Sequence, residues 1–222
     1  MHIGPTQQRL QITFGKFDAL KYTGNLDIQK VWERVLRRAD LPILYTQGFN
    51  TRPRMQLATA LPLGITSECE LLDVALREKI TTFDDLPERI MAVAPAGLRV
   101  YTVEEIPIKG PALQTLVRRA HYHIRFEDGI DRDDLQRRID DILAQERIIK
   151  VRVRRNGKKT SSDMRPLILD LDIDEKGDLL AHLSAGERGN LQPSDLLTEM
   201  GLGEAFVRVH RSALYLEDYI RR

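Results

Sequence analysis

Apolar and polar residues alternate in four stretches of the first half of the chain, and each stretch predicts a half-buried β-strand. The stretches begin near residues 10, 55, 72 and 98. In the first of them, Leu10, Ile12 and Phe14 fall on one side, because successive side chains of a strand point to opposite faces. Each strand can therefore bury one face and leave the other in water.

Two stretches between these strands repeat instead with the period of an α-helix. In the first, which follows Asn25, the apolar residues Ile28, Trp32 and Leu36 share one face. The second runs from about Asp84 to Ala94. The predicted order is strand-helix-strand-strand-helix-strand, which is the split βαβ arrangement of ferredoxin-like domains.

A second pattern follows residues 104–111, a stretch with two prolines and a glycine that reads as a connector. Its predicted elements are strands over 120–126 and 149–153 flanking a helix capped by Asp131, then strands over 167–171, 179–183 and 206–216, the last preceded by a short helix from Pro193. This half repeats the element order of the first with one strand more.

The sequence therefore predicts an α+β protein of two ferredoxin-like halves, each an antiparallel sheet with helices on one face. Residues 1–107 form the N-terminal half, and residues 108–222 form the C-terminal half with the extra strand. A central loop of the N-terminal half carries glycine and proline among polar residues, which indicates an ordered path. Its motif residues are Tyr45, Gln47, Gly48, Phe49, Asn50 and Pro53. We expect the polar side chains of this loop to hydrogen-bond to the backbone.

Charge and cysteine content narrow the classes of partner and site. The 34 Lys and Arg residues nearly balance the 33 Asp and Glu residues, so only a local cluster of basic residues predicts a polyanion partner. The single cysteine, Cys69, excludes an intrachain disulfide and a cysteine-based zinc or iron–sulfur site. The first residues do not resemble a signal peptide, and no apolar run approaches a membrane span. We expect a soluble, cytoplasmic protein with no membrane partner.

Two clusters of basic residues are the candidate nucleic-acid contacts. The first combines a helix stripe with the central loop and comprises Arg34, Arg37, Arg38, Arg52 and Arg54; the second comprises Lys150, Arg152, Arg154, Arg155, Lys158 and Lys159. Arginine-rich surfaces suit phosphate recognition. The alternative is a solvated face paired with acids, and for the second cluster Asp170 and Asp172 are the expected acids if the two strands are neighbours. This second cluster requires Ile149 and Val151 to face the core.

Candidate catalytic and metal-ligating residues are sparse. His121 and His123 share one strand face and His210 lies far along the chain, but no carboxylate is near them in sequence. Asp163 and Arg165 are a compact pair that we expect to brace a loop by pairing with each other. Ser161 and Ser162 have no adjacent histidine and no nucleophile-elbow glycines, which speaks against a serine hydrolase. The sequence thus predicts no metal, no cofactor and no catalytic residue, which favours a non-catalytic role without excluding an enzyme.

The stretch YTQGFNTRPRMQLATALPLGITSECELLDV resembles a bacterial family known as radical-S-adenosylmethionine-linked proteins, whose function is not established. The resemblance extends from about residue 9 to 215 and includes Asp163-Met164-Arg165-Pro166. Family members usually carry a Ser-His pair and a Pro-His pair where this chain has Gly24-Asn25 and Thr51-Arg52, which speaks against histidine chemistry at those places. The resemblance implies a radical S-adenosylmethionine protein as partner, and its usual gene neighbours imply RNA.

These observations lead to three hypotheses about function. The first is a non-catalytic RNA-binding or substrate-presenting partner of a radical S-adenosylmethionine enzyme. The second is a stand-alone RNA-processing enzyme on a twin ferredoxin-like frame, which needs a general base such as His210 or His121 near the basic residues. The third is a structural scaffold without nucleic-acid contact.

Overall fold

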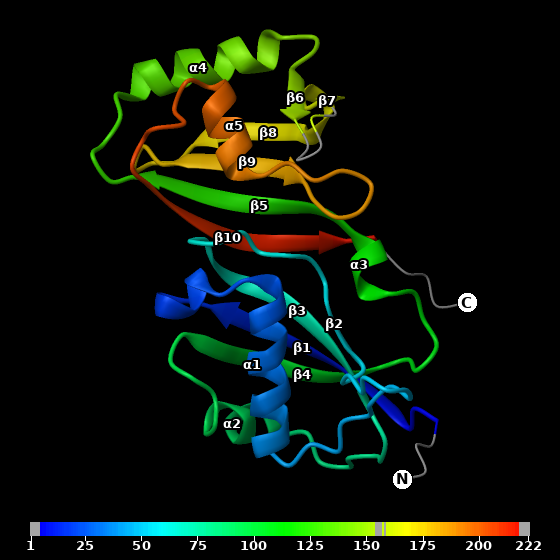
Figure 1. Cartoon of the computed structure of the whole chain (residues 1–222). Helices are drawn as coiled ribbons and strands as arrows, with labels where there is room; N and C mark the ends of the chain where they lie inside the picture. The colour runs from blue at the N-terminus through cyan, green and yellow to red at the C-terminus, as the bar shows by residue number, and fades with distance from the viewer. Residues whose placement is uncertain (1–4, 154–156, 158, 218–222) are drawn as a thin grey trace. The chain divides into compact units, whose positions relative to one another are not determined.

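Two units, each with its own strands and helices, make up residues 5–153, 157 and 159–217, the part of the chain that the computed structural model describes (Figure 1). Unit 1 comprises Met1–Val117 and Leu216–Arg222, and unit 2 comprises Arg118–Tyr215. The fold is mixed α/β with mostly antiparallel strands, as predicted at that level. The finer assignment of ferredoxin-like halves stays a prediction.

In the part of unit 1 that the structure describes, three α-helices and one 3₁₀ helix accompany four strands of one sheet. Its elements are β1 (Gln8–Lys16), a 3₁₀ helix (Asp18–Tyr22), α1 (Asn25–Arg38), β2 (Met55–Leu57), β3 (Thr66–Leu76), α2 (Leu86–Met91), β4 (Leu98–Ile106) and α3 (Leu113–Leu116). The strands lie in the order β4-β1-β3-β2, and each neighbouring pair is antiparallel. The last strand in sequence therefore lies beside the first.

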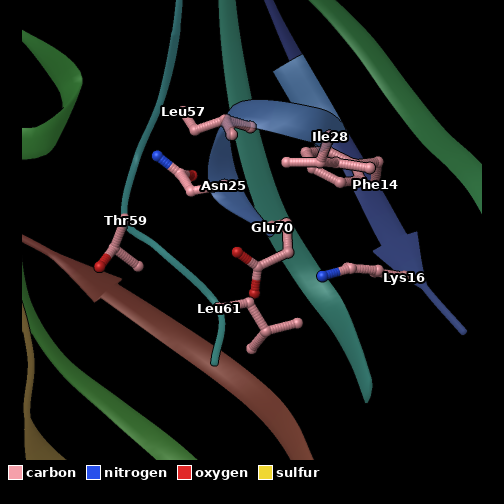
Figure 2. A pocket seen from close by; sticks show the side chains of 8 residues that line it. All are labelled: Phe14, Lys16, Asn25, Ile28, Leu57, Thr59, Leu61 and Glu70. Carbon is pink, nitrogen blue, oxygen red and sulfur yellow. The ribbon is translucent and has the colours of Figure 1, made fainter. Parts of the chain in front are cut away.

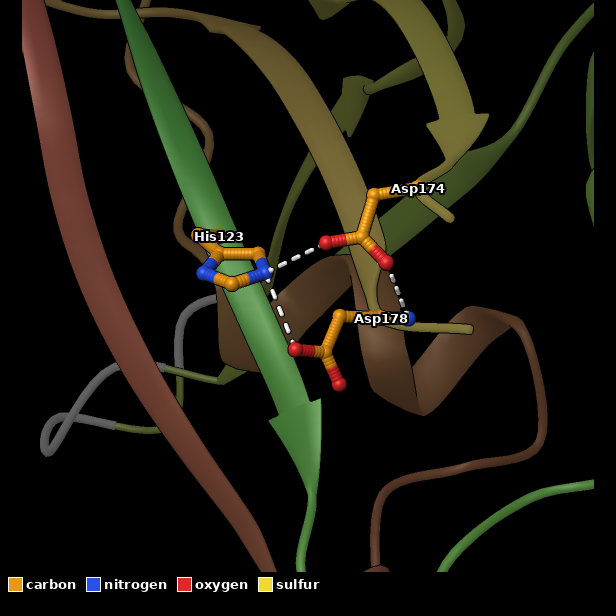
Figure 3. Close-up of side chains that lie close together, drawn as sticks. All are labelled: His123, Asp174 and Asp178. Carbon is orange, nitrogen blue, oxygen red and sulfur yellow. Dashed lines mark hydrogen bonds and ion pairs between the residues drawn. The ribbon is translucent and has the colours of Figure 1, made fainter. Parts of the chain in front are cut away.

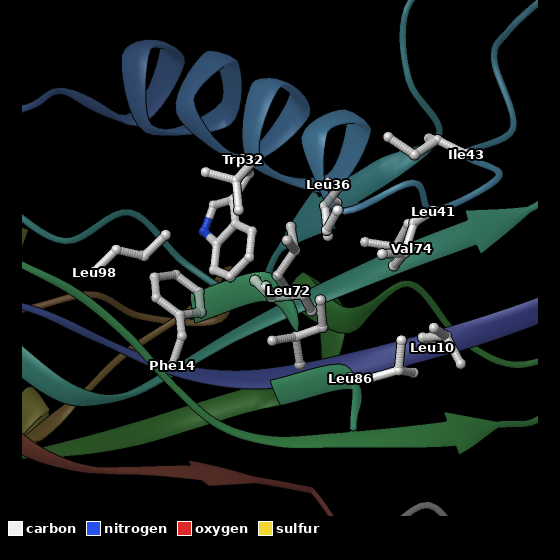
Figure 4. Close-up of a cluster of buried hydrophobic side chains, with 14 of the residues drawn as sticks. Leu10, Phe14, Trp32, Leu36, Leu41, Ile43, Leu72, Val74, Leu86 and Leu98 are labelled. Atoms are coloured by element: carbon white, nitrogen blue, oxygen red, sulfur yellow. The ribbon is translucent and has the colours of Figure 1, made fainter. Parts of the chain in front are cut away.

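The core of unit 1 lies between α1 and this sheet (Figure 4). Trp32 on α1 is fully buried and meets the ring of Phe14 on β1 edge-to-face, with ring centroids 4.9 Å apart. Leu36 of α1, and Leu72 and Val74 of β3, join the same cluster. The helical period of α1 and the alternation of β1 thus meet in one apolar layer, as the sequence predicted.

Among the residues of unit 2 that the structure describes, four strands lie in one sheet and two more form a separate hairpin. Its elements are β5 (Val117–Phe126), α4 (Arg132–Ala144), β6 (Ile149–Val153), β7 (Lys159–Asp163), a 3₁₀ helix (Arg165–Leu167), β8 (Ile168–Ile173), β9 (Leu179–Ser184), α5 (Pro193–Glu199) and β10 (Val207–Leu216). The sheet order is β10-β5-β9-β8, and β6 pairs with β7 in a two-stranded sheet. Asp131 caps α4 by accepting a hydrogen bond from the Asp134 backbone N–H, as predicted.

The orientation predicted for β6 is wrong. Ile149 and Val151 are 49% and 56% exposed, although they were expected to face the core. Because β6 pairs with β7 and not with a strand of the main sheet, its apolar side chains gain no core to enter. Ile148, just before the strand, is buried instead, at 3% exposure.

The short helix α3 belongs to unit 1, whereas the predicted halves divide between residues 107 and 108. The backbone N–H of Leu113, which is 1% exposed, donates to Oε1 of Gln56 on β2 at 3.2 Å. This contact holds α3 against β2. The chain therefore enters unit 2 at Arg118, within β5.

Candidate nucleic-acid interface

The main sheet of unit 2 has one apolar face and one polar face. On β5, Ala120, Tyr122 and Ile124 are buried, and the residues between them, His121 and His123, are half-buried on the opposite face. The helices supply matching apolar residues, since Leu135 of α4 and Leu196 of α5 are fully buried. The helix-covered face is thus the core, and the other face is free to carry polar side chains.

Four residues from three strands, which we call the histidine row, gather around this polar face: Arg119, His121, His182 and Tyr215. His121 of β5 lies opposite His182 of β9 in the antiparallel register, and their ring centroids are 5.5 Å apart. The ring of Tyr215, from β10, lies 5.3 Å from that of His182. The guanidinium of Arg119 lies over the Tyr215 ring at 5.0 Å. Three rings and one cation thus form a continuous group.

His182 is the most constrained member of the histidine row. Its Nε2 is buried and has no hydrogen-bond partner among the residues that the structure describes. Burial lowers the pKa of this imidazole, and the nearby charges of Arg119 and His121 lower it further, against a smaller opposite effect of Asp170. At neutral pH, His182 is therefore an uncharged ring with an unsatisfied nitrogen.

The histidine row can bind nucleic acid through stacking and charge. Flat rings stack on unpaired bases, and an arginine guanidinium contacts either a base face or a phosphate. Sequence reasoning missed this group because its members are spread from residue 119 to residue 215 and because aromatic residues are only 6% of the chain. Alternation in β5 signals the shared face of Arg119 and His121, but not the approach of His182 and Tyr215.

A second cluster of polar residues lies at the end of the same sheet (Figure 3). Nε2 of His123 is 3.1 Å from Oδ2 of Asp174 and 3.0 Å from Oδ2 of Asp178. Both aspartates belong to the turn between β8 and β9. Backbone N–H donors, first that of Asp178, lower the pKa of Asp174, while desolvation opposes this shift. His123 was a candidate ligand from the alternation of its strand, but its aspartate partners were not predicted, because Asp174 is 51 residues away in sequence.

The basic residues predicted in the N-terminal half fall on two neighbouring parts of unit 1. Arg34, Arg37 and Arg38 are exposed on α1, and Arg52 and Arg54 are exposed on the central loop. Tyr45 joins the two parts, since its hydroxyl donates to Oε1 of Glu33 at 3.2 Å. Burial raises the pKa of Tyr45, and the nearby Glu33 carboxylate raises this pKa further. The positive charge of Arg37 has the opposite effect and lowers it.

In the second predicted cluster, Lys150 forms an ion pair with Asp195 at the start of α5. The acids expected as partners, Asp170 and Asp172, lie on β8, which does not neighbour β6. The reason is again the pairing of β6 with β7. Lys159 is exposed on β7. Arg154, Arg155 and Lys158 lie outside the described residues, as does the side chain of Arg152.

The central loop is held mainly by its own backbone. Tyr45 and Pro53 form an isolated β-bridge, and the Thr46 N–H donates to the Arg52 carbonyl at 2.8 Å. Gly48 has a φ of 130°, which glycine tolerates best. Around it, Gln47 and Asn50 are exposed, and Phe49 projects fully into solvent. The expectation that Tyr45 bonds to backbone is wrong, because its partner is the Glu33 side chain.

Asp163 and Arg165 brace a loop, but not by pairing their charges as predicted. Oδ1 of Asp163 accepts hydrogen bonds from the backbone N–H groups of Ile148 and Arg165, at 2.9 and 3.1 Å. These bonds, with Arg147, lower the pKa of Asp163. The Arg165 guanidinium instead donates to the carbonyls of Leu143, Gln145 and Ile168. It thus satisfies carbonyls at the end of α4.

The sequence model of one bacterial family, described as an uncharacterized protein conserved in bacteria (DUF2344), matches residues 9–193. The chain belongs to this family. The match takes in most of both units, including the central loop, the Asp163–Arg165 brace and every member of the histidine row except Tyr215. No curated protein matches the chain.

Two solved structures are similar to this DUF2344 chain at low identity. One is a chain of a Cbf5–Nop10–Gar1 complex, at 12% identity and a TM-score of 0.45, covering 94% of this chain and 50% of that chain. This chain therefore spans about half the length of that relative. The other is a candidate glycine cleavage system transcriptional repressor, at 13% identity and a TM-score of 0.25, covering 91% of this chain and 95% of that chain. TM-scores this low say nothing about function.

Unit 1 of this DUF2344 chain also holds a pocket of about 260 Å³, including its open mouth (Figure 2). Its polar lining consists of Lys16, Asn25, Thr59 and Glu70. Lys16 and Glu70 are each 3% exposed, and the Lys16 ammonium donates to the Thr23 carbonyl at 2.7 Å. The stretch from Leu41 to Glu70 thus forms part of a pocket wall as well as the central loop.

Among the described residues, no helix is both long and apolar enough to cross a membrane.

Proposed function

We propose that this DUF2344 protein binds single-stranded RNA without cleaving it, through the histidine row of unit 2. The observation that carries the proposal is the continuous contact of His121, His182 and Tyr215, with the Arg119 guanidinium over the last ring. Base stacking tolerates many sequences, because every base has a flat face. The row therefore favours unpaired RNA over a duplex, whose bases are already stacked.

The state of His182 also supports recognition of bases rather than of phosphates alone. The lowered pKa of His182 keeps the ring uncharged at neutral pH. Arg119 carries a positive charge, and it is exposed enough to turn toward a phosphate.

The strand orders of both units support the ferredoxin-like assignment. In each unit the fourth strand of the βαββαβ series lies beside the first, and the third lies between the first and the second. The hairpin β6-β7 is then an insertion between α4 and β8. A sheet of this order with helices on one face leaves the other face for a ligand.

The resemblance to radical-S-adenosylmethionine-linked proteins supports a partner for the RNA complex. In this proposal the chain presents RNA to a radical S-adenosylmethionine enzyme that performs the chemistry. The test is co-purification of such an enzyme with the tagged chain, with and without ribonuclease treatment. Loss of the enzyme after ribonuclease treatment means that RNA joins the two proteins. Retention of the enzyme without RNA means that they contact each other directly. Failure to recover such an enzyme under either condition contradicts the partner, but not RNA binding.

The test of RNA binding is fluorescence anisotropy with a labelled single-stranded oligonucleotide and a duplex of the same length. Tyr215, 39% exposed, is changed to Ala, which is expected to cost about 1–3 kcal/mol of binding free energy, as for loss of one base–aromatic stack. The matched control for Arg119→Ala is Arg137→Ala, since Arg137 is an exposed arginine of α4. Equal affinity of wild type, Tyr215→Ala and Arg119→Ala, or cleavage of the oligonucleotide, contradicts the proposal.

A further inference from the structure

The cluster of His123, Asp174 and Asp178 converges from two separate parts of unit 2. His123 projects from β5, whereas the aspartates bound the turn that joins β8 to β9. One ligand-type atom of each residue, a ring nitrogen or a carboxylate oxygen, lies within 4.8 Å of the other two. Figure 3 shows the imidazole facing both carboxylates. One ring nitrogen and two carboxylate oxygens thus face a common point.

The turn holds Asp174 in place through its other oxygen. Oδ1 of Asp174 accepts hydrogen bonds from the backbone N–H groups of Lys176 and Asp178, at 2.8 and 2.9 Å. Gly177 takes a φ of 87°, which closes the turn. Arg132 secures it from outside by donating to the carbonyl of Asp174 at 2.9 Å. Oδ2 of Asp174 is therefore presented to His123 by a fixed carboxylate.

The spacing of the three atoms suits a shared divalent cation. Metal–nitrogen and metal–oxygen bonds of about 2.0–2.2 Å place neighbouring ligands of one ion roughly 3 Å apart. The observed separations from His123 Nε2, 3.1 Å to Asp174 and 3.0 Å to Asp178, are of this size. The side chains are 30%, 22% and 10% exposed, so an ion reaches them from solvent.

We infer that His123, Asp174 and Asp178 form a binding site for a divalent transition metal of the Zn²⁺ or Mn²⁺ class. One imidazole nitrogen with two carboxylates favours these ions over Ca²⁺, which takes six to eight oxygen ligands. Two aspartates balance the charge of the ion. Three protein ligands leave coordination positions open for water or another oxygen ligand.

Arg125 is the group that competes with the metal. Its Nε lies 3.2 Å from Oδ2 of Asp178, the same oxygen that His123 faces. The Arg125 side chain is 52% exposed, so it can turn into solvent when an ion arrives. The competing account is an ion-pair cluster in which His123 lies between the two aspartates and Arg125 neutralises the second. Added metal distinguishes the two accounts: a metal site binds the ion, whereas an ion-pair cluster does not.

The experiment is isothermal titration of the chelator-treated full chain with Zn²⁺ and, separately, Mn²⁺. Wild type is expected to bind one ion. The variants His123→Ala and Asp178→Asn are expected to weaken binding by roughly 100-fold or more, since losing even an outer partner of a metal ligand costs up to about that factor. The matched control is Asp170→Asn, which removes the same charge from an exposed aspartate of β8.

Two spectroscopic measurements distinguish loss of a metal ligand from misfolding of a variant. Co²⁺ bound through the His123 nitrogen has visible ligand-field bands that differ from those of aqueous Co²⁺; this difference is expected in wild type and Asp170→Asn and not in His123→Ala. Circular dichroism of each variant without metal checks its fold. No binding of either ion by wild type, or wild-type affinity in His123→Ala and Asp178→Asn, overturns the inference and leaves the ion-pair cluster. RNA binding by the histidine row stands or falls independently, because the anisotropy measurement is repeated with a metal chelator present.

Discussion

His182 shows how the structure turns an ordinary residue into a distinctive one. In the sequence it is one of five histidines with no marked neighbours. In the structure it lies between His121 and Tyr215, with a buried Nε2 and a lowered pKa. The folded protein therefore disfavours protonation of His182, whereas the unfolded chain protonates it near its ordinary pKa of about 6.5. Stability and pH are linked through this difference.

The sign of the linkage gives the first prediction. The contribution of His182 is fully present above its unfolded pKa and is lost as pH falls from about 6.5 through the lower folded pKa. Replacing His182 with Asn removes the titrating group, so the variant should lose less stability than wild type between about pH 7.5 and pH 5. Urea midpoints across this range measure the difference. Parallel pH profiles for the two proteins contradict the assignment of a lowered pKa.

Individual residues also show where sequence reasoning stops. Alternation placed Leu10, Ile12 and Phe14 in the core correctly, because β1 is paired on both sides. The same rule failed for Ile149 and Val151, whose hairpin has no neighbouring strand to build a core with. Lys150 accordingly pairs with Asp195, a partner 45 residues away that no local pattern indicates. Long-range contacts of this kind can be predicted only when the fold is known.

At the scale of elements, strong periodicity predicted well and weak periodicity did not. Helix α1 begins at Asn25 and ends at Arg38, close to the prediction, because its apolar face is regular. Helix α2 covers Leu86–Met91, shorter than the predicted 84–94. Strand β3 is longer than predicted and starts at Thr66, since its first residues pair with β1 although they lack an alternating pattern. Pairing, not propensity, sets those boundaries.

The packing of α1 on its sheet gives the second prediction. Trp32→Ala should destabilise the protein by about 3–5 kcal/mol, the usual cost of removing a fully buried large aromatic side chain. Trp32→Phe should cost less, because it keeps a ring against Phe14 and removes an indole N–H that has no partner among the described residues. Chemical denaturation measures both. A cost near zero for Trp32→Ala means that the helix does not pack as described.

The Asp163 brace gives the third prediction. Asp163→Ala removes the acceptor for the backbone N–H groups of Ile148 and Arg165. The amide of Ile148 should then exchange with solvent faster, while the amides of α1 in unit 1 serve as an internal control. Hydrogen exchange read by mass spectrometry or NMR resolves the two regions. Unchanged protection at Ile148 shows that other contacts hold this segment.

At the scale of the whole molecule, the sequence predicted a division into two parts with the same order of elements. The structure has the sheet orders β4-β1-β3-β2 in unit 1 and β10-β5-β9-β8 in unit 2, and the assignment of two ferredoxin-like halves stays a prediction. The sequence did not predict the histidine row or the cluster of His123, Asp174 and Asp178, because each forms only when strands that are far apart in sequence become neighbours. The sequence located strands and helices, and the register between strands created the sites.

The salt dependence of RNA binding gives the fourth prediction. If Arg119 contacts a phosphate, Arg119→Ala should reduce the slope of log affinity against log salt by about one, because one fewer counterion is released. Arg137→Ala should leave both affinity and slope unchanged. Equal slopes for wild type and Arg119→Ala mean that Arg119 acts on bases alone or lies outside the interface.

The most direct test of the central claim is ultraviolet cross-linking of the full chain to single-stranded RNA, followed by peptide mass spectrometry. The account predicts adducts on peptides that contain His121, His182 or Tyr215, and their loss when excess unlabelled RNA competes. Adducts confined to the unit 1 residues Arg34, Arg37, Arg38, Arg52 and Arg54, or no adduct at all, would contradict an RNA interface at the histidine row.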